Sequence, residues 1–443
     1  MLLIYLLAGT MLIQLPLVGE LMGSDVFCAG LLVYSASQGR LFPINPAQRQ
    51  FDVFILLWFA GLVASDIYQG TPFLQLARGW ANVAFFAIDF MAIRIVVGDD
   101  IKKAVTLVSL LFLVSALKLA FGIEYQRYAV GGVFGEAWKF GYGHLLSIAL
   151  FLLSAFLMVE RPTRPIGRVL PFASAAVALL CDARSIFGMT ALAAAAAAAV
   201  VGRRRHVTRK TLAWFAAAGA LAGLALVSVY AYTASHGLLG TKAFYKYASQ
   251  SLGSDNVVGL IAGGRSESFA SIQAIIDSPI IGHGSWARDY KYVFVRLIGM
   301  QAEGMSTKGV GFDMSAVRDV ALIPTHSEIL GAWVNAGILG AIFWLWALRV
   351  IFRGGITALT RPTPLTGFYL FICLNLAWDL FFSPLGADQR TITSGQLYLM
   401  MVLAATPAES TSPPEPVARR EARPFQGFEP TGDLPSTKGA DLG

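Results

Sequence analysis

The chain has 443 residues, of which 56% are hydrophobic and only 14% are charged, and its mean hydropathy is +0.62. A soluble protein of this length needs a far larger polar surface, so the composition excludes that class. The apolar runs are continuous rather than alternating, which favours transmembrane helices over a transmembrane barrel. Basic loops at a membrane surface account for the net charge of +7, so no nucleic-acid partner is expected.

About twelve apolar runs approach the length of about 20 residues that a membrane-spanning helix needs. The predicted fold is therefore an all-α, polytopic integral membrane protein. The first run lacks a basic N-terminal region and an obvious cleavage site, so it is expected to be a retained helix. The predicted spans are residues 2–19, 22–37, 52–68, 73–96, 104–121, 140–159, 168–182, 185–202, 212–232, 325–348, 365–382 and 391–405.

Four short loops predict the orientation of these spans. Segments 38–50, 161–168, 202–210 and 349–355 are basic and nearly free of acidic residues. Alternating the spans puts all four on one side, and basic loops mark the cytoplasm. Both termini are therefore expected to be cytoplasmic.

Two segments do not have the character of membrane spans. The long connection on the opposite face has Phe269, Ile272 and Ile276 at helical spacing before Pro279, which predicts short helices that cover the membrane bundle. The tail is rich in Pro, Ser and charge and is expected to be disordered. The predicted organisation is a transmembrane bundle of about nine helices at 1–232, a periplasmic loop domain at 233–323, about three further spans at 324–406 and a cytoplasmic tail at 407–443.

Arg184 is the first candidate for chemistry. It lies in a very short turn between two predicted spans, and a cation near bilayer depth is usually paired or functional. It is either a ligand for an anion or an interfacial arginine that pairs with Asp182.

Arg265 and Ser266 form the second candidate. Two glycines precede Arg265, and Ser266 is a good N-cap for the helix predicted after it. A guanidinium, a hydroxyl and the free N–H groups of a helix start suit a phosphate oxygen. The alternative is an ordinary loop-to-helix entry with a solvated arginine.

His326 is the third candidate, at the start of a span. Thr325 and Glu328 have the T-x-x-E spacing of a capping box, which predicts a helix with His326 in its first turn. The positive end of the helix dipole favours a neutral imidazole there, and such a ring can accept a proton from a hydroxyl. The alternative is a polar interface residue bonded to a neighbour.

The remaining candidates have weaker signals. Segment 124–144 is rich in glycine and aromatic residues and contains Arg127 and Lys139, a composition that suits either a sugar or plain interface anchoring. Small residues four apart, such as Gly337 and Ala341, predict tight helix packing. Further ionisable candidates in or beside predicted spans are Asp89 and Arg94, which could pair with each other, and His144 and Asp379.

The usual cofactor and metal signatures are missing. The sequence has no Walker loop, no H-E-x-x-H, no paired C-x-x-C and no dinucleotide fingerprint. Its five histidines do not form a metal-ligand spacing. The sequence therefore predicts chemistry without a metal or cofactor.

Two motifs carry a resemblance to a known family. The loop contains "GGRSESFASIQAIIDSPIIGHGSW", and "THSEILGAWVNAGILG" opens the next span. Together with an arginine after the seventh span, this pattern resembles the O-antigen ligase and O-antigen polymerase superfamily of bacterial membrane glycosyltransferases. The resemblance covers roughly residues 181–348; the earlier spans agree only in hydropathy. Ser327 departs from the asparagine common in the family.

The resemblance implies a function in the bacterial inner membrane. The family transfers a glycan from an undecaprenyl diphosphate carrier to an acceptor hydroxyl at the periplasmic face, without metal. The acceptor would be lipid A–core for a ligase or a growing glycan for a polymerase. By motif position, Arg184 and Arg265 would hold the diphosphate and His326 would orient or deprotonate the acceptor. Ser266, Ser327, Arg127 and Lys139 are the expected additional substrate-binding residues.

Ligation and polymerisation share these residues, and the sequence does not separate the two reactions; a ligase is the slightly preferred hypothesis. A lipid-glycan transporter or flippase is the alternative from another class. It would have inverted repeats and binding residues at the bilayer midplane. The sequence has no evident internal repeat, and its cations cluster on one face, so membrane glycosyl transfer is the preferred hypothesis.

Overall fold

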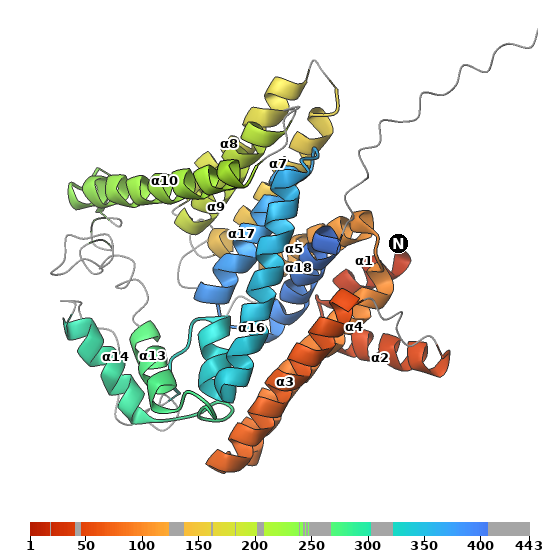
Figure 1. The fold of residues 1–443 in the computed structure, drawn as a ribbon, viewed down its shortest axis with the longest axis vertical. Coiled ribbons are helices and arrows are strands. Elements are labelled where there is room, and N and C mark those ends of the chain that lie inside the picture. Colours follow the sequence, from red (N-terminus) through yellow and green to blue (C-terminus); the bar gives the residue numbers. More distant parts are fainter. Residues whose placement is uncertain are drawn as a thin grey trace, which may run out of the picture. The chain divides into compact units, whose positions relative to one another are not determined.

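The computed structural model describes residues 1–17, 19–39, 46–123, 137–160, 163–181, 183–201, 208–238, 267–302 and 322–405, with residues 240, 241, 244 and 247. The residues from Met1 to Ala405 belong to one compact unit, drawn in Figure 1. The predicted tail at 407–443 lies outside the described residues.

The described elements are helical apart from one short hairpin. They are α1 (Leu2–Thr10), β1 (Gln14–Leu17), β2 (Gly19–Met22), α2 (Gly23–Ser37), α3 (Pro46–Gln69), α4 (Phe73–Val97), α5 (Ile101–Ala120), a π-helical turn (Trp138–Tyr142), α7 (Gly143–Leu157), α8 (Arg164–Leu180), α9 (Arg184–Val200), α10 (Arg209–Ser235), α13 (Glu267–Asp277), α14 (Tyr290–Ala302), α16 (Glu328–Thr360), α17 (Thr366–Phe382) and α18 (Ala387–Ala405).

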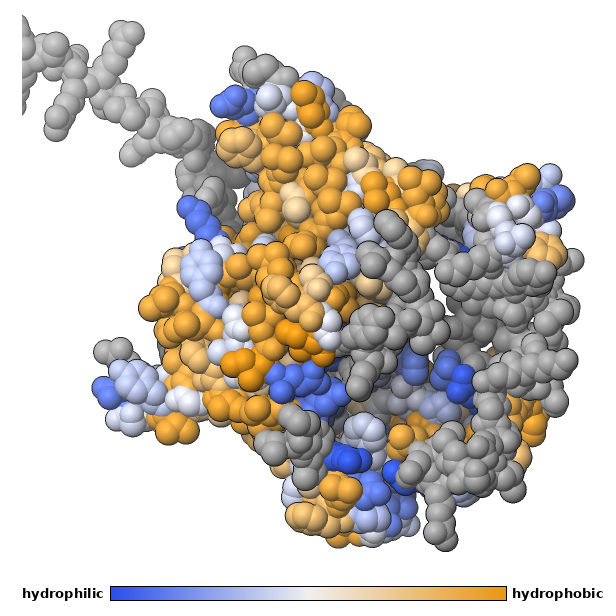
Figure 2. All heavy atoms as spheres, turned by 180° about the vertical axis from the view of Figure 1, so that it is seen from behind, coloured by the Kyte–Doolittle hydropathy of each residue, from blue (hydrophilic) through white to orange (hydrophobic). Residues whose placement is uncertain are grey.

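Six stretches of described helix are long and apolar enough to cross a membrane. They lie in α3, α4, α5, the π-helical turn with α7, the second part of α10, and α16; α9 and α17 are apolar but shorter. Many large apolar side chains, such as Leu56 and Phe156, are exposed, and apolar residues cover much of the face in Figure 2. An apolar surface of this kind fits lipid contact. The structure thus agrees with an all-α membrane protein.

The prediction of one helix over residues 2–19 is wrong. Helix α1 ends at Thr10, and β1 and β2 pair as an antiparallel hairpin before α2 begins. Pro16 lies in β1, and a proline both lacks the N–H that a helix needs and disfavours helical backbone in the residue before it. The apolar composition hid this local break.

Helix α16 packs against several other helices of the bundle. It lies along α3, α17 and α18 (Figure 1). Phe343 and Trp344 on α16 are buried against Phe51 and Trp58 on α3. Tightly packed aromatic pairs contribute roughly 0.5–1.5 kcal/mol beyond the apolar area they bury. The predicted basic loop at 349–355 is in fact part of this helix, which continues to Thr360.

Gly337 breaks α16 into two parts. Its backbone has φ 64° and ψ −155°, which is not helical. A Cβ on Gly340 would lie 2.8 Å from the carbonyl carbon of Ala332, although eight residues of a straight helix span about 12 Å. The first part of α16, residues 328–336, is therefore bent sharply back toward the second part.

The segment 279–284 fills this break with backbone hydrogen bonds. The N–H of Ile338 donates to the carbonyl oxygen of Ile280 at 3.2 Å, and the N–H of His283 donates to that of Val334 at 2.7 Å. Breaking a helix leaves backbone groups without partners, and burying them unpaired is costly. The inserted segment supplies those partners, so the bend and the segment stabilise each other.

The end of α3 holds Gly284, the last residue of this segment, and Ser285 directly after it. The carboxylate of Asp66 accepts hydrogen bonds from the N–H and the hydroxyl of Ser285 at 2.6 and 2.7 Å. The hydroxyl of Ser65 accepts from the N–H of Gly284 at 2.8 Å. The segment is thus clamped between α3 and the bend of α16.

Gly337→Ala is expected to destabilise the protein by roughly 2 kcal/mol or more. A positive φ is strained for alanine, and the added methyl would clash with the carbonyl of Ile280. Gly188→Ala is the matched control, because Gly188 lies within helix α9 and a Cβ there meets nothing within 4 Å. Thermal inactivation in detergent measures both. Equal stability of the two variants would contradict the described bend.

Candidate functional site

His326 lies just before the first part of α16 and is exposed. The helix begins at Glu328, and its N-cap is Ser327, whose hydroxyl accepts from the N–H of Leu330 at 3.2 Å. The predicted capping box between Thr325 and Glu328 is therefore wrong, and His326 precedes the cap. His326 is therefore not in the first turn of the helix, contrary to the prediction.

Two bonds inside the bundle explain the shifted cap. The hydroxyl of Ser327 also donates to the carbonyl oxygen of Leu380 on α17 at 2.8 Å. The carboxyl of Glu328 is 3% exposed and faces Thr393 on α18, 3.4 Å away. Glu328 thus points into the bundle instead of back toward Thr325. Ser327 has a structural role, and its buried hydroxyl is already bonded within the protein.

Arg184 is the first residue of α9. Its guanidinium carbon lies 3.8 Å from the centroid of the Tyr230 ring on α10. A cation above an aromatic face is attracted by roughly 0.5–2 kcal/mol. Asp182, the alternative partner named from the sequence, lies outside the described residues.

The packing of α9 against α17 relates Arg184 to His326. A Cβ on Gly367, at the start of α17, would lie 3.4 Å from the Cβ of Ala197, near the end of α9. The two helices pack along their lengths, so they run antiparallel. Thirteen residues, about 20 Å, separate Gly367 from Leu380 and also Ala197 from Arg184. Arg184 is thus level with Leu380, to which Ser327 is bonded.

The structure brings only part of the predicted site into view. Arg184 and Ser327, the residue next to His326, lie at the same end of the α9–α17 pair. Arg265, Ser266 and Arg127 lie outside the described residues. Lys139 is exposed in the π-helical turn, with its ammonium 4.8 Å from the centroid of the Phe140 ring.

The helix predicted before Pro279 is confirmed as α13. Its buried residues are Ala270, Ser271 and Ala274, whereas Ile272 and Ile276 are exposed. Ala270 and Ala274 form a small core with Tyr292 of α14 and Val334 of α16. Small side chains therefore make the contact with the bundle, and the isoleucines point elsewhere.

Asp277 joins α13 to α14. Its carboxylate accepts from the ammonium of Lys291 at 2.6 Å and from the hydroxyl of Tyr292 at 2.8 Å. The hydrogen bond from Lys291, with that from Tyr292, lowers the pKa of Asp277 to about 2. Burial, with the bond to this carboxylate, raises the pKa of Tyr292. At neutral pH, Asp277 is therefore ionised and Tyr292 is neutral.

The intramembrane ions pair differently from the prediction. Arg94 forms an ion pair with Asp52 at 3.3 Å rather than with Asp89. The carboxylate of Asp89 instead accepts from the hydroxyl of Thr391 at 2.6 Å.

A buried ion pair that the sequence does not indicate joins α2 to α18. Asp25 and Arg390 lie 2.6 Å apart and are almost fully buried. The sequence gives little sign of this pair, because Asp25 lies near the boundary of a short apolar run and Arg390 directly precedes the last predicted span.

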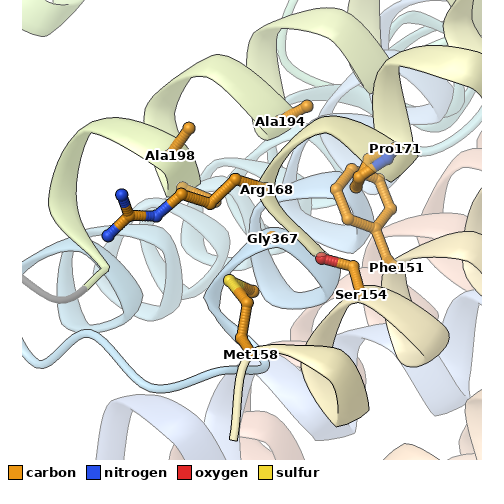
Figure 3. A pocket seen from close by; sticks show the side chains of 9 residues that line it. Phe151, Ser154, Met158, Arg168, Pro171, Ala194, Ala198 and Gly367 are labelled. Atoms are coloured by element: carbon orange, nitrogen blue, oxygen red, sulfur yellow. The ribbon is translucent and has the colours of Figure 1, made fainter. Parts of the chain in front are cut away.

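One described pocket lies away from these residues. It lies among α7, α8, α9 and the start of α17 (Figure 3). Its lining includes Phe151, Met158 and Gly367, with Arg168 as its charged member. Gly367 marks the opposite end of the α9–α17 pair from Arg184, so this pocket is not the predicted site. Within the described part of the chain, no group of three or more His, Cys, Asp or Glu side chains could hold a metal.

Comparison with known proteins adds no assignment: the sequence matches no protein-family model and no curated protein. The resemblance to O-antigen ligases therefore depends on the two motifs and their order in the chain.

Ser327→Ala is expected to lower stability by roughly 1–2 kcal/mol, because it removes the N-cap and the bond to Leu380. Thr325→Ala is the control and should cost much less, since Thr325 does not cap the helix. Thermal stability of the two purified variants measures the difference. A larger loss of stability in Thr325→Ala than in Ser327→Ala would contradict the described cap and support the capping box predicted from the sequence.

Acid is expected to loosen the contact between α13 and α14. The pKa of Asp277 is below its ordinary value of 3.8, so its ionised form stabilises the fold above about pH 4. That contribution declines as the pH falls through about 4 toward 2. Hydrogen exchange in α13 should accelerate over this range in the wild type. In Asp277→Asn, exchange should already be faster at neutral pH and should change less with acid.

Proposed function

We propose that this protein transfers a glycan from undecaprenyl diphosphate to an acceptor hydroxyl, such as one on lipid A–core, at the periplasmic face of the inner membrane. The observation that carries the proposal is the exposed His326 beside a helix start that is bonded to α17 at the level of Arg184. A base for an alcohol and a cation for a diphosphate are the two groups that this reaction needs.

The chemistry is a displacement at the anomeric carbon of the glycan. The acceptor oxygen forms a bond to that carbon, and the bond from the carbon to the diphosphate oxygen breaks. His326 would take the proton of the acceptor hydroxyl as a general base. Arg184 and Arg265 would stabilise the charge that develops on the leaving diphosphate. No metal is required in this scheme.

The local structure of Arg184 supports its role. The guanidinium lies over the Tyr230 ring, with its carbon 3.8 Å from the ring centroid, and this cation–π contact helps to hold the side chain in place. The planar fork of arginine matches two phosphate oxygens at once. Arg265, by motif position, would provide the second fork.

The packing around His326 supports positioning of the base. Ser327 caps the helix and bonds Leu380, and Glu328 is anchored among α18 side chains. The residues that follow His326 are therefore fixed, while His326 itself is exposed. A fixed backbone with an accessible ring is what a general base at a substrate-facing surface requires.

His326→Ala, Arg184→Ala and Arg265→Ala are each expected to reduce glycan transfer by about 100-fold or more. Arg265→Lys should lose most of the activity, since a point charge replaces a bidentate fork. The assay uses purified lipid-linked donor and normally expressed protein. Arg349→Ala and His236→Ala are controls at exposed positions outside the proposed site. Undiminished transfer by the three alanine variants would refute the proposal.

A deletion strain separates the two reactions of the superfamily. Loss of a ligase leaves full-length polymer on the lipid carrier, whereas loss of a polymerase leaves single repeat units. Lipid-linked glycan retained on the cytoplasmic side, with neither ligation nor polymerisation, would instead indicate a flippase.

A further inference from the structure

A cluster of buried polar side chains lies where the first part of α16 meets α17 and α18. Glu328 begins α16 and is 3% exposed. Asp379 lies near the end of α17, directly before Leu380, whose carbonyl oxygen accepts a hydrogen bond from Ser327, the residue before Glu328. Asn375, one turn earlier on α17 and 2% exposed, donates from its amide nitrogen to Asp379 at 3.1 Å and to Gln396 of α18 at 3.2 Å.

Several atoms of this cluster have no hydrogen-bond partner. They include two oxygen acceptors: Oε2 of Glu328 and Oδ1 of Asn375. The other two are Nε2 of Gln396 and Nδ1 of His144, which begins α7. Buried polar atoms in folded proteins are nearly always satisfied, so unpaired ones require an explanation. Here the unpaired oxygens belong to side chains that are almost fully buried, and they lie beside a second carboxyl group.

The charge of the cluster needs the same explanation. Glu328 is almost fully buried and Asp379 is partly buried beside it, and no Lys or Arg among the described residues forms an ion pair with either carboxyl group. An uncompensated buried charge is strongly unfavourable in a membrane protein. The other buried acidic pair, Asp25 and Asp89, differs because Arg390 lies within it.

His144 does not supply the missing positive charge. Its ring is stacked against Phe112 at 5.6 Å and lies 6.4 Å from Phe371. Its side chain contacts Asn375, whereas Nδ1 is buried without a partner. An imidazolium has two N–H donors, and one of them would be left unsatisfied in this apolar slot. The neutral ring fits the site better.

We propose that Glu328, Asp379 and Asn375 form a binding site for one small monovalent cation, either a proton or an alkali ion such as Na⁺. Oxygen ligands from carboxyl, amide and hydroxyl groups suit a hard cation. The hydroxyls of Thr393 and Ser383 lie 3.4 Å from Glu328 and 2.8 Å from Asp379. The proposal does not depend on the glycosyl-transfer reaction.

The bound cation would hold the base of the bent helix in place. Glu328 is the first residue of α16 and Ser327 its cap, so attraction between the cation and both carboxyls ties that helix start to α17. His326 is two residues away from Glu328. Occupancy of the site would therefore fix the backbone that carries His326, whatever reaction His326 serves.

The test uses the full-length protein in lipid nanodiscs. In one arm, sodium chloride replaces choline chloride at constant ionic strength and pH, and the melting temperature is recorded. In the other arm, infrared difference spectra at neutral pH between the wild type and each variant report any protonated carboxyl. The variants are Glu328→Gln and Asp379→Asn, which keep the shape of the side chain and remove its charge. Asp277→Asn, an acid on α13 outside the cluster, is the control.

An alkali-ion site predicts a melting temperature that rises with sodium by a few degrees, about 2–4 °C, and loses this dependence in both variants but not in the control. A proton site predicts no sodium effect and a protonated-carboxyl band that disappears in Glu328→Gln or Asp379→Asn. The two variants remove different carboxyls, so the test survives if one of them fails to fold. If the folded wild type shows neither the sodium effect nor the protonated-carboxyl band, the proposal is overturned.

Discussion

The arrangement around His326 depends on the backbone hydrogen bonds between segment 279–284 and the break in α16. A helix interrupted in an apolar bundle exposes N–H and C=O groups that lipid cannot satisfy. Ile280 and His283 supply partners for Ile338 and Val334, and Asp66 holds the segment from α3. The long connection before α16 is thus part of the packing of the bundle, which explains why one compact unit contains both.

The bend also decides what the start of α16 can do. A straight helix from Glu328 to Thr360 would be about 50 Å long, longer than a hydrocarbon core of about 30 Å. Bent at Gly337, its first part instead turns back toward the second and starts against α17, where Ser327 bonds Leu380. Glu328 becomes buried while His326 stays exposed. With the helix bent at Gly337, Glu328 lies inside the bundle, whereas His326, two residues earlier, lies at the surface.

The glycosyl-transfer proposal and the cation-site proposal use adjacent parts of this arrangement. The first depends on Arg184, Arg265 and His326 and on the resemblance of two motifs. The second depends on the burial and the unpaired oxygens of Glu328 and Asn375. Either can fail without the other, because a buried counter-charge is required by electrostatics whatever substrate the exposed histidine meets.

The sequence by itself determined the membrane class, the helix before Pro279 and the candidate residues Arg184 and His326, because hydropathy, periodicity and motif spacing are local properties. It could not determine the end of α1 at Thr10, since a long apolar run outweighed the signal of Pro16. It also could not choose between Thr325 and Ser327 as the cap, because both can cap a helix. Tertiary structure chose Ser327, since Leu380 and Thr393 offered partners that lie about 50 to 70 residues away in the chain. The group of Glu328, Asp379 and Asn375 arises for the same reason: contacts between helices bring together polar side chains that lie far apart in the sequence.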